Sequence, residues 1–181
     1  MKILDTKTIY QDEYIEVLQD SCLIGEHTGT FTYLKVRNKS TLDTAVMVMP
    51  LTETGVYMVK QYRVANRAYF WQFPGGGIED VGNIEASALR ELEEEAGLQA
   101  KEISHLGTAV LEPGAVAQRT HFTCAHNLTQ TKTHHEDHEE IVDVRHYTFK
   151  QIDQMIENSD IQCGFTLVGI LLLKQKGYWN V

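Results

Sequence analysis

The stretch Gly75-Gly76-Gly77, followed by Arg90-Glu91-Leu92-Glu93-Glu94-Glu95-Ala96-Gly97-Leu98, decides how this chain is organised. Four carboxylates lie within the five residues 91–95, in a segment that no proline interrupts. Asn83 is suited to cap the start of a helix, and Gly97 is suited to end it in the left-handed conformation. The sequence therefore predicts a glycine-rich turn followed by an acidic helix over residues 84–96.

Helical periodicity places Glu91, Glu94 and Glu95 on one arc of this helix, because they are i, i+3 and i+4 neighbours. Like charges at this spacing cost about 0.2–0.5 kcal/mol per pair. Carboxylates in the last turns also meet the negative end of the helix dipole. The adjoining arc is apolar and is expected to face the core: Ala88, Leu89, Leu92 and Ala96.

A bound divalent cation would explain the carboxylate cluster. Arg90 can offset part of the charge by reaching Glu94 or Glu93. All-oxygen ligands favour Mg²⁺, or Mn²⁺ as an alternative, over zinc. The competing interpretation is an acidic, solvated helix face, which is the commoner meaning of such a charge pattern. The flanking glycines favour the metal site.

Around this helix the chain alternates between strand and helix patterns. Runs of β-branched, aromatic and alternating apolar residues predict the strands, and the last part of the chain predicts two more helices. A turn is expected at 26–29 and a polar break at 38–40. The expected strands are 6–10, 14–24, 30–37, 45–49, 56–62, 68–73, 103–111, 121–126 and 141–148, and the expected helices are 149–157 and 165–176. The pattern predicts an α/β domain with a mixed sheet.

Composition limits the class of protein. The chain has 181 residues, enough for one domain with a modest extension, and a net charge of −9 that argues against a nucleic-acid partner. Cys22, Cys124 and Cys163 are odd in number and far apart, as in a reduced cytoplasmic protein. The apolar run 165–173 is about half the length of a membrane span. We expect a soluble cytoplasmic protein that does not associate with membranes.

The glycine run and the helix resemble the Nudix box, which reads Gly, five residues, Glu, seven residues, then Arg-Glu-apolar-any-Glu-Glu-any-Gly-apolar. Gly76 takes the first position, and residues 90–98 match the second half without a gap. One position departs from the pattern, because Gly82 stands where the family has its first Glu. That Glu is credited with steadying the junction of loop and helix. Glu79 and Asp80, in the same loop, are candidates to replace it.

Segments outside the box narrow the resemblance. Gln61-Tyr62-Arg63 and Trp71-Gln72-Phe73-Pro74-Gly75-Gly76-Gly77 are similar to the "QYR … EFPAGG" segments of ADP-ribose and nucleoside-diphosphate-sugar pyrophosphatases. Residues 159–173 resemble the last helix of that subfamily. The resemblance implies an α/β/α sandwich over residues 41–181, preceded by an antiparallel β extension over residues 1–40. In the subfamily such an extension commonly builds a dimer interface, so a homodimer is implied.

The same resemblance implies roles for individual residues. Glu91 and Glu95 would be the principal metal ligands, Glu94 would assist, and the Gly75 carbonyl would be a main-chain ligand. The substrate would lie against Arg63, Gly76 and Glu112, although a surface salt bridge is the alternative for Arg63 and plain surface the alternative for Glu112.

The subfamily carries its general base in a Glu-rich loop, which here is His134-His135-Glu136-Asp137-His138-Glu139-Glu140. Glu139 or Glu140 is therefore the candidate for activating water and for catalysis together with Glu94, and Asp137 is a poorer third. Sequence alone does not choose between the two glutamates. Composition alone would predict a solvated loop.

The implied activity is Mg²⁺-dependent hydrolysis of the pyrophosphate bond of ADP-ribose or a related nucleoside-diphosphate sugar. The products would be a nucleoside monophosphate and a sugar phosphate. Gln72 and Gln118 are neutral where the subfamily usually carries an acid, which with Gly82 suggests an altered substrate or metal count. Two alternatives stay open: a module that binds a nucleotide sugar as a sensor with little or no turnover, and an enzyme for other nucleoside polyphosphates.

Overall fold

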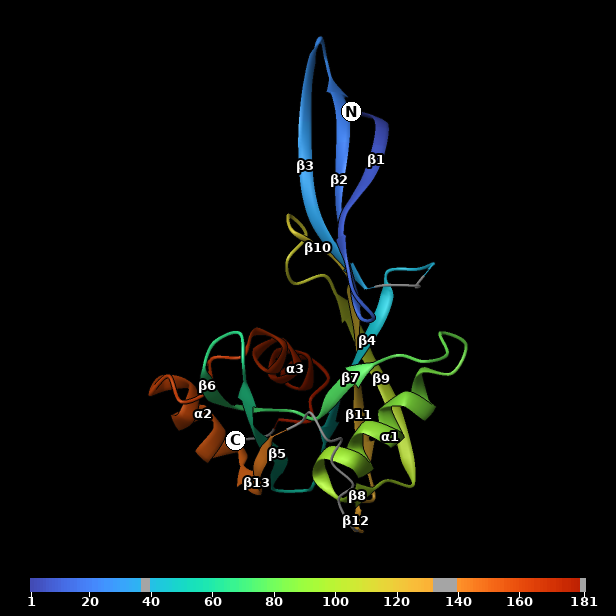
Figure 1. Cartoon of the computed structure of the whole chain (residues 1–181). Helices are drawn as coiled ribbons and strands as arrows, with labels where there is room; N and C mark the ends of the chain where they lie inside the picture. The colour runs from blue at the N-terminus through green and yellow to red at the C-terminus, as the bar shows by residue number, and fades with distance from the viewer. Residues whose placement is uncertain (37–39, 132–139, 180–181) are drawn as a thin grey trace. The chain divides into compact units, whose positions relative to one another are not determined.

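The computed structural model describes residues 1–36, 40–131 and 140–179 and shows strands interspersed with helices (Figure 1). The strands are β1 (Lys2–Gln11), β2 (Ile15–Ile24), β3 (His27–Val36), β4 (Asp43–Pro50), β5 (Gly55–Arg63), β6 (Ala68–Gln72), β7 (Gly75–Gly77), β8 (Leu98–Gln99), β9 (Glu102–Ala109), β10 (Val116–Ala117), β11 (Arg119–His126), β12 (Thr129–Gln130) and β13 (Ile141–Thr148). The helices are α1 (Ile84–Ala96), α2 (Phe149–Glu157) and α3 (Gly164–Gln175). The predicted mixed α/β fold is confirmed.

Contacts divide the chain into two compact units. The N-terminal unit comprises Met1–Thr44 and Val110–Arg119, and the C-terminal unit comprises Ala45–Ala109 and Thr120–Val181. Residues 110–119 make their contacts with the first unit because β10 pairs in parallel with β3. The division into residues 1–40 and 41–181 stays a prediction, and the contacts add residues 110–119 to the N-terminal unit.

The N-terminal unit is a sheet with strand order β1-β2-β3-β10. β1, β2 and β3 form an antiparallel meander, as predicted for the extension. The turn between β2 and β3 lies at Gly25-Glu26 and not at residues 26–29, because Ile24 pairs directly with His27. Gly25 takes the left-handed φ of 62° that a two-residue hairpin turn needs at its first position.

The C-terminal unit has layers of helix on both faces of a sheet with strand order β7-β4-β11-β9. Alternation along β4 builds two cores. Val46 and Val48 pack with Ala88 and Leu92 of α1, whereas Met47 and Met49 pack with residues of α2 and α3. Figure 1 shows α1 and α3 on opposite sides of these strands. A second sheet of order β13-β5-β6 completes the unit.

Helix α1 begins and ends at the residues expected from the sequence. The Asn83 side chain accepts a hydrogen bond from the Ala86 N–H at 3.1 Å, and Gly97 ends the helix with φ 61°. The buried face carries both apolar and polar side chains: Ser87, Ala88, Glu91, Leu92, Glu95 and Ala96. Leu89, predicted for the core, is only half-buried.

The glycine run is a strand and not a turn. Gly75–Gly77 forms β7, which pairs with β4 in antiparallel fashion. A Cβ atom at Gly75 would overlap the Val46 carbonyl oxygen, so glycine permits a close backbone approach here. The prediction of a turn was wrong because glycine's small size, and not its freedom at positive φ, explains this residue.

Other expectations have mixed outcomes. Strand β9 ends at Ala109, two residues before the predicted end, and the short strands β8, β10 and β12 were not predicted. The predicted break at 38–40 falls largely on residues outside the described part. The cysteines are free thiols, two of them buried. Within the described ranges, no helix combines the length and the apolar character that a membrane span requires.

Candidate functional site: a carboxylate face on helix α1

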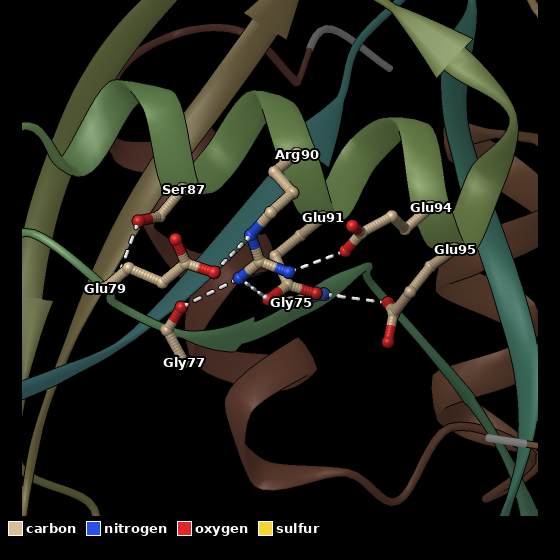
Figure 2. Close-up of polar contacts among 8 residues, drawn as sticks. All are labelled: Gly75, Gly77, Glu79, Ser87, Arg90, Glu91, Glu94 and Glu95. Carbon is tan, nitrogen blue, oxygen red and sulfur yellow. Dashed lines mark hydrogen bonds and ion pairs between the residues drawn. The ribbon is translucent and has the colours of Figure 1, made fainter. Parts of the chain in front are cut away.

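Two of the four clustered carboxylates of α1 are buried. Glu91 is 5% exposed and Glu95 is 0% exposed, whereas Glu94 keeps a side-chain exposure of 27%. Figure 2 shows these side chains extending from α1 toward the strand that carries Gly75 and Gly77. Burial of charged carboxylates is costly unless charge partners and hydrogen bonds compensate. This burial argues against the solvated-face interpretation for Glu91 and Glu95.

The backbone of β7 lies directly against these carboxylates. The Gly75 N–H donates a hydrogen bond to Glu95 Oε2 at 2.9 Å. A Cβ atom at Gly76 would overlap Glu91 Oε1, so a larger residue there would displace that carboxylate from this position. Together, Gly75 and Gly76 form a backbone cradle for Glu91 and Glu95.

Arg90 lies among three carboxylates and a carbonyl (Figure 2). Nη2 donates to Glu91 Oε1 at 2.6 Å and to the Gly77 carbonyl at 3.1 Å, and Nη1 donates to Glu94 Oε2 at 2.5 Å. Nε is 3.3 Å from Glu79 Oε1. The predicted contact between Arg90 and Glu94 is present, and Glu93 instead binds the Gln99 side chain.

The charge balance of the cluster favours a permanently charged Arg90. Partial burial opposes its charge, but the neighbouring Glu91 and Glu94 carboxylates outweigh that effect and raise the pKa of Arg90 above its usual value. One guanidinium compensates only part of the charge of Glu79, Glu91 and Glu94. Three carboxylates around one guanidinium make an oxygen-rich arrangement that suits a hard divalent cation.

The donor set suits a hard divalent cation. Carboxylate oxygens of Glu91, Glu94 and Glu95, beside the Gly75 backbone, are the oxygen ligands that Mg²⁺ and Mn²⁺ prefer. In the part of the chain that the structure covers, no three His, Cys, Asp or Glu side chains are grouped closely enough to hold a metal as they stand. Arg90 instead binds Glu91 Oε1 and Glu94 Oε2 and so orients these two carboxylates.

Arg63 lies at the end of β5 in a chain of polar contacts. Its Nε donates to Gln72 Oε1 at 3.1 Å, and Gln72 Nε2 donates to Gln61 Oε1 at 2.7 Å. A cavity of about 620 Å³ lies beside them, and its lining is a mixture of amides, aromatic rings and a thiol. The residues that line it include Arg63, Phe70, Gln72, Gln162, Cys163 and Phe165. The neutral amide of Gln72 is thus a direct hydrogen-bond partner of Arg63 at the edge of this cavity.

The remaining predicted site residues lie in different places. The Glu140 carboxylate accepts a hydrogen bond from the Tyr69 hydroxyl at 2.5 Å, and this bond raises the pKa of Tyr69. Glu139 and Asp137 lie outside the described residues. Glu112 belongs to the N-terminal unit, where its carbonyl accepts the Val116 N–H at 2.9 Å, and Gln118 belongs to the same unit.

Comparison with known proteins assigns the family. A NUDIX domain profile matches residues 41–163. The chain belongs to the Nudix family. The ADP-ribose pyrophosphatase of Bacillus subtilis (strain 168) is 31% identical over 134 residues, which are 73% of this chain and 72% of the relative. The predicted resemblance to the ADP-ribose pyrophosphatase subfamily is confirmed, as is the prediction of a Nudix pyrophosphatase.

Two further similarities are informative. A methanol dehydrogenase activator of Bacillus methanolicus is 29% identical over 132 residues, covering 72% of this chain and 71% of the relative. A crystal structure of an ADP compounds hydrolase superposes with a TM-score of 0.81 at 20% identity, covering 98% of this chain and 96% of that one. The latter likeness confirms the Nudix-type fold.

Sequence reasoning missed several contacts around this Nudix box. The Ser87 hydroxyl accepts the Glu79 N–H at 3.4 Å and joins the loop to α1. The buried Thr166 hydroxyl accepts the Phe73 N–H at 3.3 Å and joins α3 to the segment before β7. Ser87 precedes Glu91 by four residues, so helical spacing could have placed it on the carboxylate face. No pattern in the sequence links Thr166 with Phe73.

Proposed function

We propose that this chain is a Mg²⁺-dependent hydrolase of the pyrophosphate bond in ADP-ribose or a related nucleoside-diphosphate sugar. The products would be a nucleoside monophosphate and a sugar phosphate. One observation carries the proposal: α1 buries Glu91 and Glu95 against the glycines of β7. The similarity to the Bacillus subtilis ADP-ribose pyrophosphatase supports the substrate class.

Glu91 and Glu95 would be the principal ligands of the divalent ion, with Glu94 assisting and the Gly75 carbonyl as a main-chain ligand. A bound Mg²⁺ would neutralise charge on two adjacent phosphates and lower the pKa of water. The cradle of Gly75 and Gly76 holds the two buried carboxylates in place, so less reorganisation is needed when the ion binds. Mn²⁺ would fit the same oxygen donors.

The cavity beside Arg63 is our proposed site for the rest of the substrate. The guanidinium of Arg63 would contact the substrate as a cation, and Phe70 and Phe165 offer aromatic surface next to the amides Gln72 and Gln162. Gln72 and Gly75 are three residues apart, so their Cα atoms are separated by at most about 11 Å. A single nucleotide sugar is long enough to reach from this cavity to the carboxylates. Gly76 and Glu112 stay proposed substrate contacts.

Glu139 or Glu140 is our proposed general base. In the structure Glu140 accepts the Tyr69 hydroxyl, so it would act only after giving up or sharing that bond. Glu139→Gln and Glu140→Gln separate the two residues. The variant of the true base should lower kcat about 100- to 10,000-fold while Mn²⁺ binding is kept.

Hydrolysis of a panel of nucleoside-diphosphate sugars with Mg²⁺ tests the proposal, with products identified by ³¹P NMR. Glu95→Gln should lower kcat about 100-fold or more, the effect of losing one charge stabiliser at an active site. Glu93→Gln on the same helix is the matched control and should leave kcat unchanged. If Glu95→Gln does not fold, Glu91→Gln serves the same purpose.

Other results would point to the alternatives. Tight binding of ADP-ribose without turnover, in both wild type and Glu95→Gln, would indicate a sensor. Turnover of nucleoside triphosphates or dinucleoside polyphosphates in preference to sugars would indicate another Nudix substrate. Gly82, Gln72 and Gln118 are the sequence departures that make these alternatives worth testing. The cytoplasmic location stays a prediction from the sequence.

We also propose that the N-terminal sheet forms a homodimer interface. One face of the sheet carries large apolar side chains that are exposed: Ile3 at 57%, Phe31 at 47% and Ile24 at 44%. Register places them on the same face, because Ile3 pairs with Cys22 and Phe31 with Asp20, and both partners share that face with Ile24. Grouped exposed apolar residues of this size are typical of interaction surfaces.

Light scattering coupled to size exclusion should give the mass of two chains. Phe31→Glu should convert the dimer to monomer, because it would bury a charge at the interface. Thr32→Glu is the control, since this exposed neighbour lies on the opposite face of β3. A dimer that persists in Phe31→Glu would show that this face is not the interface.

A further inference from the structure

We infer that Glu79 is the positioning residue that replaces the missing first glutamate of the Nudix box. Its role would be to hold Arg90 so that Arg90 orders Glu91 and Glu94. The inference rests on the proposed metal-binding role of these carboxylates. The inference concerns Gly82, because the motif has a glutamate at this position and this chain has a glycine.

The backbone at Gly82 does not require glycine. Its φ is not left-handed; among the glycines of the described chain, only Gly25, Gly97 and Gly177 have a positive φ. The atoms nearest to an ideal Cβ at Gly82 belong to the Asp80 side chain, with Oδ1 at 3.1 Å. The Asp80 carboxylate would have to shift slightly to make room for this Cβ. A larger residue at position 82 would therefore need only a small shift of Asp80, and the backbone does not impose glycine there.

Of the two candidates in the loop, Glu79 is the one that contacts Arg90. Its Oε1 is 3.3 Å from Arg90 Nε, at ion-pair distance although not aligned as a hydrogen bond. Asp80 instead uses Oδ1 to accept the Gly82 N–H at 2.8 Å, which shapes the loop. Figure 2 shows Glu79 beside the guanidinium, on the side away from Glu94.

The backbone of Glu79 is fastened to the same helix. Its N–H points to the Ser87 hydroxyl at 3.4 Å, and Ser87 is only 4% exposed. Residue 79 therefore contacts α1 at two points, through its backbone at Ser87 and through its carboxylate at Arg90. This double contact joins loop and helix, which is what the family's first glutamate is credited with doing.

The consequence for the site follows from the geometry of the guanidinium. Nη1 and Nη2 bind Glu94 and Glu91, and Nε is the edge left for Glu79. Glu79 attracts that edge and thereby fixes the plane of the guanidinium, because the planar fork cannot turn one edge without turning the others. The orientations of Glu91 and Glu94 would thus depend on a loop carboxylate that does not itself bind the metal.

The test uses Mn²⁺ alone as the probe, with affinity measured by electron paramagnetic resonance on the full chain. Glu79→Gln should weaken Mn²⁺ binding about tenfold, the effect typical of losing an outer-shell partner. Adding Gly82→Glu to this variant should restore the affinity to within about threefold of wild type. Glu85→Gln, in the exposed first turn of α1, is the charge-matched control and should bind Mn²⁺ like wild type.

The thermal midpoint should stay the same in all variants, because the Glu79 side chain is 76% exposed and an exposed ion pair adds little stability. Unchanged Mn²⁺ affinity in Glu79→Gln would overturn the inference, and so would a loss that Gly82→Glu does not restore. If wild type itself binds no Mn²⁺, the proposed metal function fails first, and the inference fails with it.

Discussion

At the scale of single residues, two adjacent glycines of β7 have opposite surroundings. A Cβ at Gly76 would overlap the Glu91 carboxylate, whereas a Cβ at Gly77 would meet nothing within 4 Å. Gly76→Ala should therefore displace Glu91 and weaken Mn²⁺ binding about tenfold, as for other losses of ligand positioning. Gly77→Ala is the matched control. Equal Mn²⁺ affinity in the two variants would contradict the cradle described for Glu91.

Two cysteines, Cys124 and Cys163, differ in their exposure to solvent. Burial raises the pKa of the Cys124 thiol to about 12, so almost no thiolate forms near neutral pH. Cys163 is half-buried and lines the cavity beside Arg63. Iodoacetamide should alkylate Cys163 before Cys124, as mass spectrometry of the peptides would show. ADP-ribose should slow the reaction at Cys163, and equal rates with and without it would argue against substrate in this cavity.

At the scale of the element, α1 is the helix on which the site depends. Asn83→Ala removes the side-chain oxygen that accepts the Ala86 N–H. The change should lower the free energy of unfolding by about 1 kcal/mol. Asn83→Ser keeps a capping oxygen and should cost only a few tenths of that. Urea denaturation followed by circular dichroism measures both. If both variants lowered the free energy of unfolding equally, the hydrogen bond from the Ala86 N–H to the residue-83 side chain would not be the cause.

At the scale of the whole molecule, histidine burial couples stability to pH. Burial lowers the pKa of His146, whose Nε2 lies 2.9 Å from the Thr52 hydroxyl. Burial, with help from His121 and Lys176, also lowers the pKa of His105. The unfolded chain therefore binds protons more readily than the folded chain at these two positions. This contribution to stability is complete above the unfolded pKa of about 6.5 and is lost as pH falls below it.

Urea unfolding at pH 7.5 and pH 5.5 should accordingly show lower stability at the acid value. His146→Gln should reduce the part of this difference that His146 causes, because the amide does not titrate. His27→Gln, at an exposed hairpin end, is the control and should leave the difference as in wild type. If stability were equal or higher at pH 5.5 in wild type, the direction assigned to the pKa values of His105 and His146 would be wrong.

Features that depend on residues close together in the sequence were predicted, whereas features that depend on distant residues were not. The ends of α1 were predicted to the residue, because Asn83 and Gly97 act on backbone groups within one turn. The strands were found from alternation, but the pairing of β10 with β3 was not, because two residues carry no period. The glycines of β7 were misread as a turn, since the carbonyl that crowds Gly75 lies on β4, far away in the sequence.

The motif spacing predicted the family, and near-neighbour rules of helical spacing and capping predicted the acidic helix and the arc shared by Glu91, Glu94 and Glu95. Three features became visible only in the folded chain: Glu95 is fully buried, Gly75 and Gly76 lie against the carboxylates, and Glu79 is the loop acid that contacts Arg90. Burial and close approach depend on segments that folding brings together, and the order of residues along the chain does not record those distances.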